Sequence, residues 1–386
     1  MRFPQACRLM AWVAIAPVLL GGCSIFRPAV EVHALTAREA IELKRSDILT
    51  RDKLSDATIQ TIRVAALDVK ACAKPISSEC VEALAAVTGI ATDRRLAALS
   101  ELWLAQAQAM EPGSVQQAAW LETIRYAYAY LFLGDHTPGE RAFEDRQTQV
   151  RDWYNYAVEH AAAGMFEIRQ QMPAQLPALT SGTIAGWELK LDLRSARMSG
   201  SAAVPAELVP ASSLSFRGLR SLYRRDGFGA ELVAVMPDDS LNATPTQDGH
   251  PVAKHSQPAL PWSEMPAPSM TVLLHPDGDS LDSVLHTHTA RLTVHDPYVE
   301  SAIMLRGQRV PLAANFTAGY GLWLARSKFN RQSLRSLLGR EGGIDRPHVY
   351  LMQPYDPNRR IIVMLHGLAS SPEAWVELAN EILGDE

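Results

Sequence analysis

The stretch that decides the fold lies near the end of the chain, at Ile361-Ile362-Val363-Met364-Leu365-His366-Gly367. Its apolar residues follow one another without a polar residue between them. This predicts a strand buried on both faces, as in a parallel sheet covered by helices. A shorter apolar stretch, Pro347 to Met352, predicts another strand. After the His-Gly pair, Trp375, Leu378 and Ile382 recur at helical spacing and predict a helix that buries these three side chains.

The loop between this strand and this helix carries a specific pattern, His366-Gly367-Leu368. The pattern resembles the oxyanion loop of α/β-hydrolases of the lipase and esterase type. The resemblance implies that the backbone N–H of Leu368 donates to the developing oxyanion and that Gly367 permits a tight backbone path. It also implies that His366 is structural and is not the catalytic histidine. Residues 336–386 are then expected to be the first strand, loop and helix of an α/β-hydrolase domain; the alternative is an apolar strand that ends in an ordinary turn.

The catalytic residues of such a hydrolase are expected elsewhere. The family requires a Gly-x-Ser-x-Gly nucleophile elbow after the oxyanion loop, followed by an acid and a histidine. The 386 residues contain no such elbow, so we expect the nucleophile, acid and base to be missing from this chain and the chain to be inactive. A complete hydrolase sheet needs on the order of 200 further residues, which indicates a fragment or a truncated product.

The first 22 residues have the features of a secretory signal peptide. Two arginines supply positive charge, and residues 9–20 are almost continuously apolar but too short for a comfortable membrane span. Leu20-Gly21-Gly22-Cys23 follows and resembles the lipobox of bacterial lipoproteins. The alternative is an ordinary cleaved signal peptide followed by a chance cysteine.

The lipobox resemblance implies that the signal is cut before Cys23 and that the Cys23 thiol carries a lipid anchor. Residues 23–35 are then a lipidated tether, and the membrane is a partner through that anchor. Because Ser24 is not an inner-membrane retention residue, the resemblance also implies export to the outer membrane of a Gram-negative bacterium. The anchored protein faces either the periplasm or the cell exterior.

The two cysteines of the exported part, Cys72 and Cys80, are close in sequence. In an oxidising compartment such cysteines form disulfides. We therefore predict a Cys72–Cys80 disulfide that joins the two sides of a helix-turn-helix corner. A metal site is not expected there, because two thiols are too few ligands and no histidine lies nearby.

Residues 36–171 have a helical pattern throughout. Helices are expected to begin after Ser55 and at Thr92, and a longer one is expected over Ser114–Leu133. Thr137-Pro138 is expected to open the next helix. Antiparallel helix pairs of this kind build repeat arrays, although no repeat of fixed period is present. The pattern predicts a helical-repeat-like all-α domain.

Tyr126, Tyr128 and Tyr130 form a ladder in the expected long helix. One interpretation is a groove in which these rings bind a ligand. The other is that the rings fill the core and the seams between packed helices, which is the commoner use of aromatic side chains in a helix pair.

Residues 172–335 have the pattern of a mostly β domain, for which a sandwich is one arrangement. Trp187 to Leu193 alternates apolar and polar residues, which is typical of a half-buried strand. The Pro-, Asp-, Ser- and Thr-rich residues 237–268 predict a long loop between strands. Further strands are expected at Glu231–Met236, Met270–His275, Ala290–His295 and Ala302–Leu305.

Two motifs in this region have a functional and a structural interpretation. Residues 224–229 look like a phosphate-binding loop, but the lysine and the following helix are missing, so Asp226-Gly227 favours a hairpin turn. His286 and His288 lie two apart, as metal ligands on a strand do, and His295 follows. No further ligand cluster accompanies them, which favours an ordinary exposed strand and no metal.

The fold class predicted from these patterns is a multidomain α+β protein. The net charge of −5 and the absence of a basic block argue against nucleic-acid binding, and no cofactor is expected. The first functional hypothesis is the N-terminal part of a membrane-anchored serine hydrolase that acts on an acyl ester or lipid. The second is a non-enzymatic lipoprotein whose helical domain binds a protein partner, and the third is a degenerate product without function.

Overall fold

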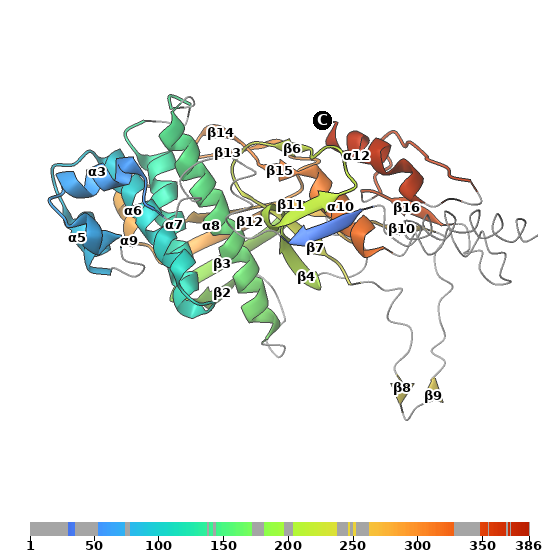
Figure 1. The fold of residues 1–386 in the computed structure, drawn as a ribbon, viewed down its shortest axis with the longest axis horizontal. Helices are drawn as coiled ribbons and strands as arrows, with labels where there is room; N and C mark the ends of the chain where they lie inside the picture. The colour runs from blue at the N-terminus through green and yellow to red at the C-terminus, as the bar shows by residue number, and fades with distance from the viewer. Residues whose placement is uncertain are drawn as a thin grey trace, which may run out of the picture.

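The protein has a mixed α+β fold in the computed structural model (Figure 1). The helices of residues 56–170 gather on one side of a curled mixed sheet, and the helices of residues 316–326 and 376–384 lie on its other side (Figure 1). The structure describes residues 30–34, 53–73, 78–136, 139–141, 144–171, 181–196, 204–237, 246–247, 250–251, 262–327, 348–353, 355–367, 370 and 372–385.

Among the residues that the structure describes, the helical part contains three long helices and three short ones. Helix α3 begins at Asp56, and the Ser55 side chain caps it by accepting from the backbone N–H of Thr58. The expected helices at Ser55, Thr92 and Ser114–Leu133 are confirmed. The remaining long helix begins at Asp145, and Thr137-Pro138 lies outside the described residues. The helices are α3 (Asp56–Val64), α4 (Val69–Cys72), α5 (Ser78–Ala86), α6 (Thr92–Ala109), α7 (Ser114–Leu133) and α8 (Asp145–Gln170).

The strands form one six-stranded sheet in the order β2-β3-β12-β11-β7-β4. Only the β3–β12 pair is parallel in this sheet. The four strands expected in its centre from alternation and apolar runs are confirmed within one or two residues. The strands are β2 (Ser181–Ile184), β3 (Trp187–Ser195), β4 (Glu207–Pro210), β7 (Ala230–Val235), β11 (Ser269–Pro276) and β12 (Thr289–His295).

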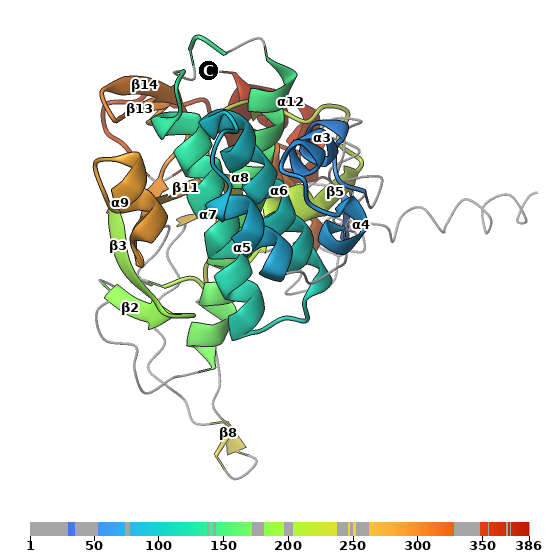
Figure 2. The ribbon, with the colours of Figure 1, turned by 90° about the vertical axis from the view of Figure 1, so that its left-hand side faces the viewer.

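Helices α7 and α8 cover one face of this sheet (Figure 2). On the central strand β7, Leu232 and Ala234 face this layer, whereas Val233 faces the opposite layer with α10 (Phe316–Arg326). The sheet is therefore covered by helices on both faces at β7, and the expected β-sandwich is wrong. The residues of β7 are buried in an almost unbroken run, because a strand between two helical layers has no face in contact with solvent.

The helical part and the sheet share one hydrophobic core, which includes α7, α8 and the central strands. Tyr154 donates a hydrogen bond of 2.9 Å to the Leu274 carbonyl, and Arg125 donates to the carbonyls of Leu285 and Thr287. Tyr128 and Tyr130 are buried in this core and Tyr126 packs against it, so the three rings fill the core and the seams between packed elements. The expected boundary between a helical and a mostly β domain, at residues 171 and 172, stays a prediction.

Shorter elements complete the described fold. The expected strand Ala302–Leu305 is confirmed as β13, and part of the excursion 237–268 forms a small β8–β9 pair. The other elements are β1 (Glu31–Ala34), η4 (Ala211–Ser213), β5 (Leu214–Arg217), β6 (Arg224–Arg225), β8 (Thr246–Gln247), β9 (His250–Pro251), β10 (Trp262–Glu264), α9 (Leu281–His286), β14 (Gln308–Pro311), β15 (Ala314–Asn315), β16 (Val349–Leu351), η5 (Pro372–Trp375) and α12 (Val376–Gly384).

Candidate functional site

The terminal segment begins with a short parallel strand pair. Strand β16 pairs with β10, with Val349 opposite Trp262 and Leu351 opposite Glu264. The backbone N–H of Met265 extends the pair by donating to the Leu351 carbonyl at 2.8 Å. The strand expected over 347–352 is therefore confirmed, and it lies next to the excursion that separates β7 from β11.

The apolar run that follows is exposed. Ile361, Ile362, Val363 and Leu365 are 64–79% exposed, and the run lies outside the strands. The expected strand buried on both faces is wrong for this structure. The physical reason is that no strand within the described ranges pairs with the run, so only Met364 packs against a hydrophobic cluster, the one that contains α10 and α12.

The two described residues of the expected oxyanion loop lie in an exposed turn. The Nδ1 atom of His366 is 3.2 Å from the Gly367 carbonyl oxygen, and the backbone N–H of Ser370 donates to that oxygen at 3.1 Å. No atom lies within 4 Å of the position that a Cβ on Gly367 would occupy. The surroundings of Gly367 would therefore leave room for a side chain, so they do not require the tight backbone path that the resemblance implies. Leu368, the expected oxyanion donor, lies outside the described residues.

The helix expected after the loop is confirmed as η5 and α12, but its buried face was predicted wrongly. Leu378 and Ile382 are 42% and 38% exposed, whereas Val376 and Leu383 are buried. Buried Asn380 sets this orientation, because its Oδ1 accepts from the Thr317 hydroxyl at 2.9 Å and its Nδ2 donates to the Ser221 carbonyl at 2.8 Å. The leucine and isoleucine expected in the core therefore form an apolar outer face.

The three histidines weighed as metal ligands do not come together on a strand. His286 is the last residue of helix α9, so the expectation that it lies on a strand is wrong. His288 contacts the Trp187 ring with the ring centroids 5.5 Å apart, and His295 ends β12. Within the described ranges, no group of three His, Cys, Asp or Glu side chains is arranged to hold a metal ion.

His295 instead lies in a hydrogen-bonded chain that the sequence did not reveal. Its Nδ1 is 2.6 Å from Glu300 Oε2 and its Nε2 is 2.8 Å from Thr293 Oγ1. The Ser195 hydroxyl donates to the other oxygen of Glu300 at 3.2 Å, which links β3 to the loop after β12. A hydroxyl, an imidazole and a carboxylate in this order can move a proton from the hydroxyl, as in hydrolytic triads. The spacing Thr-x-His on one strand face, with Glu300 five residues later, is the signal that could have found this chain.

The glycine-containing segment of residues 224–229 pairs with β15 and is hydrogen-bonded to α8, and it does not form the expected hairpin. Strand β6 within it pairs with β15, so the hairpin with β7 is wrong. Asn155 of α8 holds the segment, since its Nδ2 donates to the Gly227 carbonyl at 2.9 Å and its Oδ1 accepts from the Gly229 N–H at 2.7 Å. Gly229 has φ +103°, a region that favours glycine.

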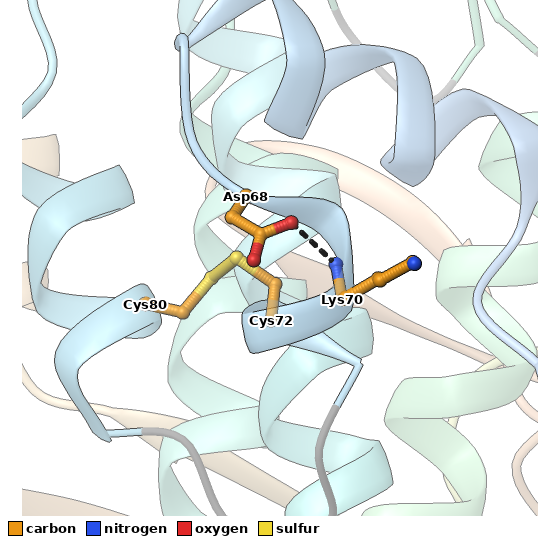
Figure 3. The surroundings of a disulfide bond; sticks show 4 residues. All are labelled: Asp68, Lys70, Cys72 and Cys80. Carbon is orange, nitrogen blue, oxygen red and sulfur yellow. Dashed lines mark hydrogen bonds between the residues drawn. A yellow bond between two sulfur atoms is a disulfide. The ribbon is translucent and has the colours of Figure 1, made fainter.

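Cys72 and Cys80, the predicted pair, are joined by a disulfide in the structure (Figure 3). The bond links the short helix α4 to the start of α5, with the two Cα atoms 5.2 Å apart. Asp68 caps α4 by accepting from the Lys70 N–H at 3.0 Å (Figure 3). Both cysteines are buried in a small cluster with Ile62, Leu84 and Leu99 of the neighbouring helices. The disulfide therefore fixes the edge of the helical layer.

We expect the double substitution Cys72→Ala/Cys80→Ala to lower the free energy of unfolding by about 2–3 kcal/mol. The disulfide closes a loop of 8 residues, and the lost loop-closure entropy in the unfolded chain sets the magnitude. Urea unfolding followed by circular dichroism measures the loss. Dithiothreitol should lower the midpoint of the wild-type protein and leave the double variant unchanged. Free thiols at both positions in the non-reduced protein would contradict the prediction.

Cys23, the expected site of lipidation, lies outside the described residues. Among the described helices, none is both long enough and apolar enough to cross a bilayer. Comparisons with protein-family models, with curated proteins and with solved structures find no match for this chain. The resemblance of His366-Gly367-Leu368 to a hydrolase loop therefore stays a prediction.

Proposed function

We propose that this chain is the N-terminal part of an exported, lipid-anchored serine hydrolase of the α/β-hydrolase type that acts on carboxylic esters or lipids. The lipobox at Cys23 provides the anchor, and residues 336–386 begin the catalytic domain. Leu368 supplies one oxyanion N–H from the loop that follows the strand. The helical layer and the six-stranded sheet are then accessory parts that hold the catalytic domain or its substrate near the membrane.

The exposure of the run Ile361–Leu365 is the observation that carries this proposal. Folded proteins rarely leave a contiguous apolar stretch in water unless another surface covers it. The side chains of Leu378 and Ile382, on the outer face of α12, are exposed as well. In an α/β-hydrolase such a run is a central strand, and neighbouring parallel strands and helices cover it on both faces. The run is thus uncovered in the described residues, as a central hydrolase strand would be without its neighbouring strands.

The neighbours of the run also fit this proposal. A parallel strand, β16, precedes it, and a helix that packs inward through Val376 and Leu383 follows it. The turn at His366-Gly367 lies between the run and that helix, where a hydrolase places its oxyanion donors. A serine hydrolase of this type also needs a nucleophile elbow, an acid and a histidine, and the 386 residues contain no Gly-x-Ser-x-Gly.

The transcript read past the Glu386 codon tests the proposal directly. We expect coding sequence for Gly-x-Ser-x-Gly, then an acid and a histidine, in frame or after a single frameshift. We also expect a fluorophosphonate probe to label the longer product and to leave the 386-residue chain unlabelled. A stop codon with no such downstream sequence would refute the proposal and favour the non-enzymatic alternative.

A variant of Thr293 distinguishes labelling of a downstream serine from labelling at the hydrogen-bonded chain of Thr293, His295 and Glu300. If the probe labels the 386-residue protein and Thr293→Val abolishes that labelling, the hydroxyl on β12 is the nucleophile and the downstream assignment is wrong. Thr293→Val keeps the shape of the side chain and removes only the hydroxyl. Glu82→Gln on the exposed face of α5 is the matched surface control.

A further inference from the structure

A cavity of about 180 Å³ lies between helix α8 and the six-stranded sheet. Its walls come from the last turns of α8, from strands β2, β3, β11 and β12, and from the segment that leads into β4. Small residues on facing elements leave this space open. Ala162 of α8 and Gly182 of β2 both line it, and neither has a side chain that reaches across the gap between helix and sheet. Protein interiors are otherwise close-packed, with few voids larger than a water molecule.

The cavity runs from the core towards the surface. Three of its lining residues, Met165, Val272 and Val294, are only 2–7% exposed and form the inner end. Other lining residues are partly exposed. Among them are Leu191 of β3 and Leu292 of β12, although helix α8 covers this face of the sheet. The lining therefore offers apolar contacts along its depth and an opening to solvent.

The lining contains three polar side chains, and each of them is already engaged. Lys190 forms an ion pair of 2.9 Å with Asp277, and the side-chain amide of Gln170 donates to the Ala206 carbonyl. Arg169 has an interaction partner of its own within the protein. A charged ligand group would lose hydration at this wall without gaining a free partner. The lining therefore favours a neutral ligand that it recognises through apolar contacts alone.

The size of the cavity defines the length of such a ligand. An apolar cavity of about 150 Å³ stays dry and holds one benzene molecule. The cavity next to α8 is slightly larger, so it fits an aliphatic chain of about six to eight carbon atoms. Each methylene that leaves water for an apolar lining strengthens binding about fourfold. Leucine, methionine and valine walls give no hydrogen-bond partner to a sugar or nucleotide, which excludes these ligand classes from the interior.

We propose that this cavity binds the aliphatic chain of a neutral molecule such as a medium-chain alcohol, with the chain among the apolar walls and the neutral head at the opening. The site uses no residue of the terminal segment 348–385, so it does not depend on the hydrolase proposal. Failure of either proposal leaves the other unchanged.

Calorimetric titration of the purified full chain with 1-octanol, 1-butanol and octanoate tests the proposal. We expect saturable binding of 1-octanol at a ratio of one. 1-Butanol has four methylenes fewer and should bind about 200-fold more weakly. Octanoate at pH 8 has a chain of the same length and a charged head, so it should bind at least about tenfold more weakly than 1-octanol.

The variant Gly182→Leu should block the cavity and keep the fold. Gly182 lies opposite Leu189 in the β2–β3 pair, so an added side chain points to the face that α8 covers. The nearest atom to the added Cβ is a guanidinium nitrogen of Arg169 at 3.8 Å, an ordinary contact. Because the leucine takes the space of two or more methylenes, 1-octanol should bind at least about tenfold more weakly.

Gly139→Leu is the matched control, because Gly139 is exposed, lies outside the lining and has no atom within 4 Å of an added Cβ. It should bind 1-octanol as the wild-type protein does. Far-ultraviolet circular dichroism shows whether both variants fold, and the comparison of the three ligands on the wild-type protein decides the outcome if Gly182→Leu does not.

Four results would overturn the proposal. The first is that 1-octanol does not bind saturably, and the second is that 1-butanol binds as well as 1-octanol. The third is that octanoate binds as tightly as 1-octanol or more tightly, since the site would then recognise a charge. The fourth is that folded Gly182→Leu and Gly139→Leu bind 1-octanol equally.

Discussion

Replacing Glu101 by alanine should lower the free energy of unfolding by about 3–5 kcal/mol, the range for removing one partner of a buried charged pair. Glu101 is 4% exposed on α6. One oxygen accepts from the Ser55 N–H at 2.6 Å, and the other accepts from the hydroxyls of Ser55 and Thr58. Arg146 of α8 completes the cluster with an ion pair of 3.3 Å to the same carboxylate. The substitution takes the carboxylate away from the half-buried Arg146 guanidinium, which keeps side-chain oxygens of Ser55 and Thr58 as acceptors, and it leaves the Ser55 N–H without its carboxylate acceptor.

Chemical unfolding at pH 7 measures this loss, and two variants control it. Glu82→Ala removes an exposed glutamate from α5 and should change stability by less than about 0.5 kcal/mol. The double variant Glu101→Leu/Arg146→Met removes both charges and keeps apolar bulk, so it should be more stable than Glu101→Ala. If Glu101→Ala lowers the free energy of unfolding by less than about 1 kcal/mol, removing the carboxylate does not leave an uncompensated charge at Arg146, and the prediction is wrong.

This cluster illustrates which features the sequence reveals. Apolar spacing predicts a helix after Ser55, and α3 begins at Asp56 with Ser55 as its cap. Its second function, binding a carboxylate 46 positions away, depends on how α3 meets α6. Local patterns specify caps and periodicity, whereas the partner of a buried polar group depends on tertiary packing.

The terminal segment shows the same limit. Apolar spacing predicted helix α12, but that spacing contains two apolar stripes, one with Leu378 and Ile382 and one with Val376 and Leu383. A buried asparagine between the residues of the second stripe decided which one faces the core. The helical spacing that begins at Trp375 favours the first stripe, which is exposed in the structure. The prediction of a buried strand at Ile361–Leu365 is wrong for a related reason. A buried strand requires neighbouring strands, and the pattern of apolar residues does not report whether they are present.

Lowering the pH from 7 to 4 should also destabilise the fold strongly, through His160 and His275. The pKa of both imidazoles is lowered to about 4, chiefly by burial; for His275 the nearby Arg291 contributes to the lowering and Asp277 opposes it. His160 stacks on Trp120 with ring centroids 5.0 Å apart. Both side chains are therefore neutral in the folded protein across the range in which an unfolded histidine takes up a proton.

The direction of the effect follows from proton binding. Between a pKa of about 6.5 in the unfolded chain and about 4 in the fold, the unfolded state binds more protons, so stability falls as the pH falls. Each histidine should remove about 3 kcal/mol by pH 4. Glu122 acts in the opposite sense, because burial raises the pKa of its carboxyl and the folded state then binds the proton more tightly. Its titration therefore opposes the loss from the two imidazoles.

Urea midpoints at pH 7, 5.5 and 4.5 measure this dependence. His160→Gln and His275→Gln should each flatten the curve, because a glutamine does not titrate and the unfolded chain then gains one proton fewer. His286→Gln, at the exposed end of α9, should keep the slope of the wild-type protein. If the three variants and the wild type lose stability equally between pH 7 and 4.5, the two buried imidazoles do not cause the acid sensitivity. Equal slopes would also mean that the charged forms of these rings are solvated in the folded protein, because desolvation is the main cause of both pKa shifts.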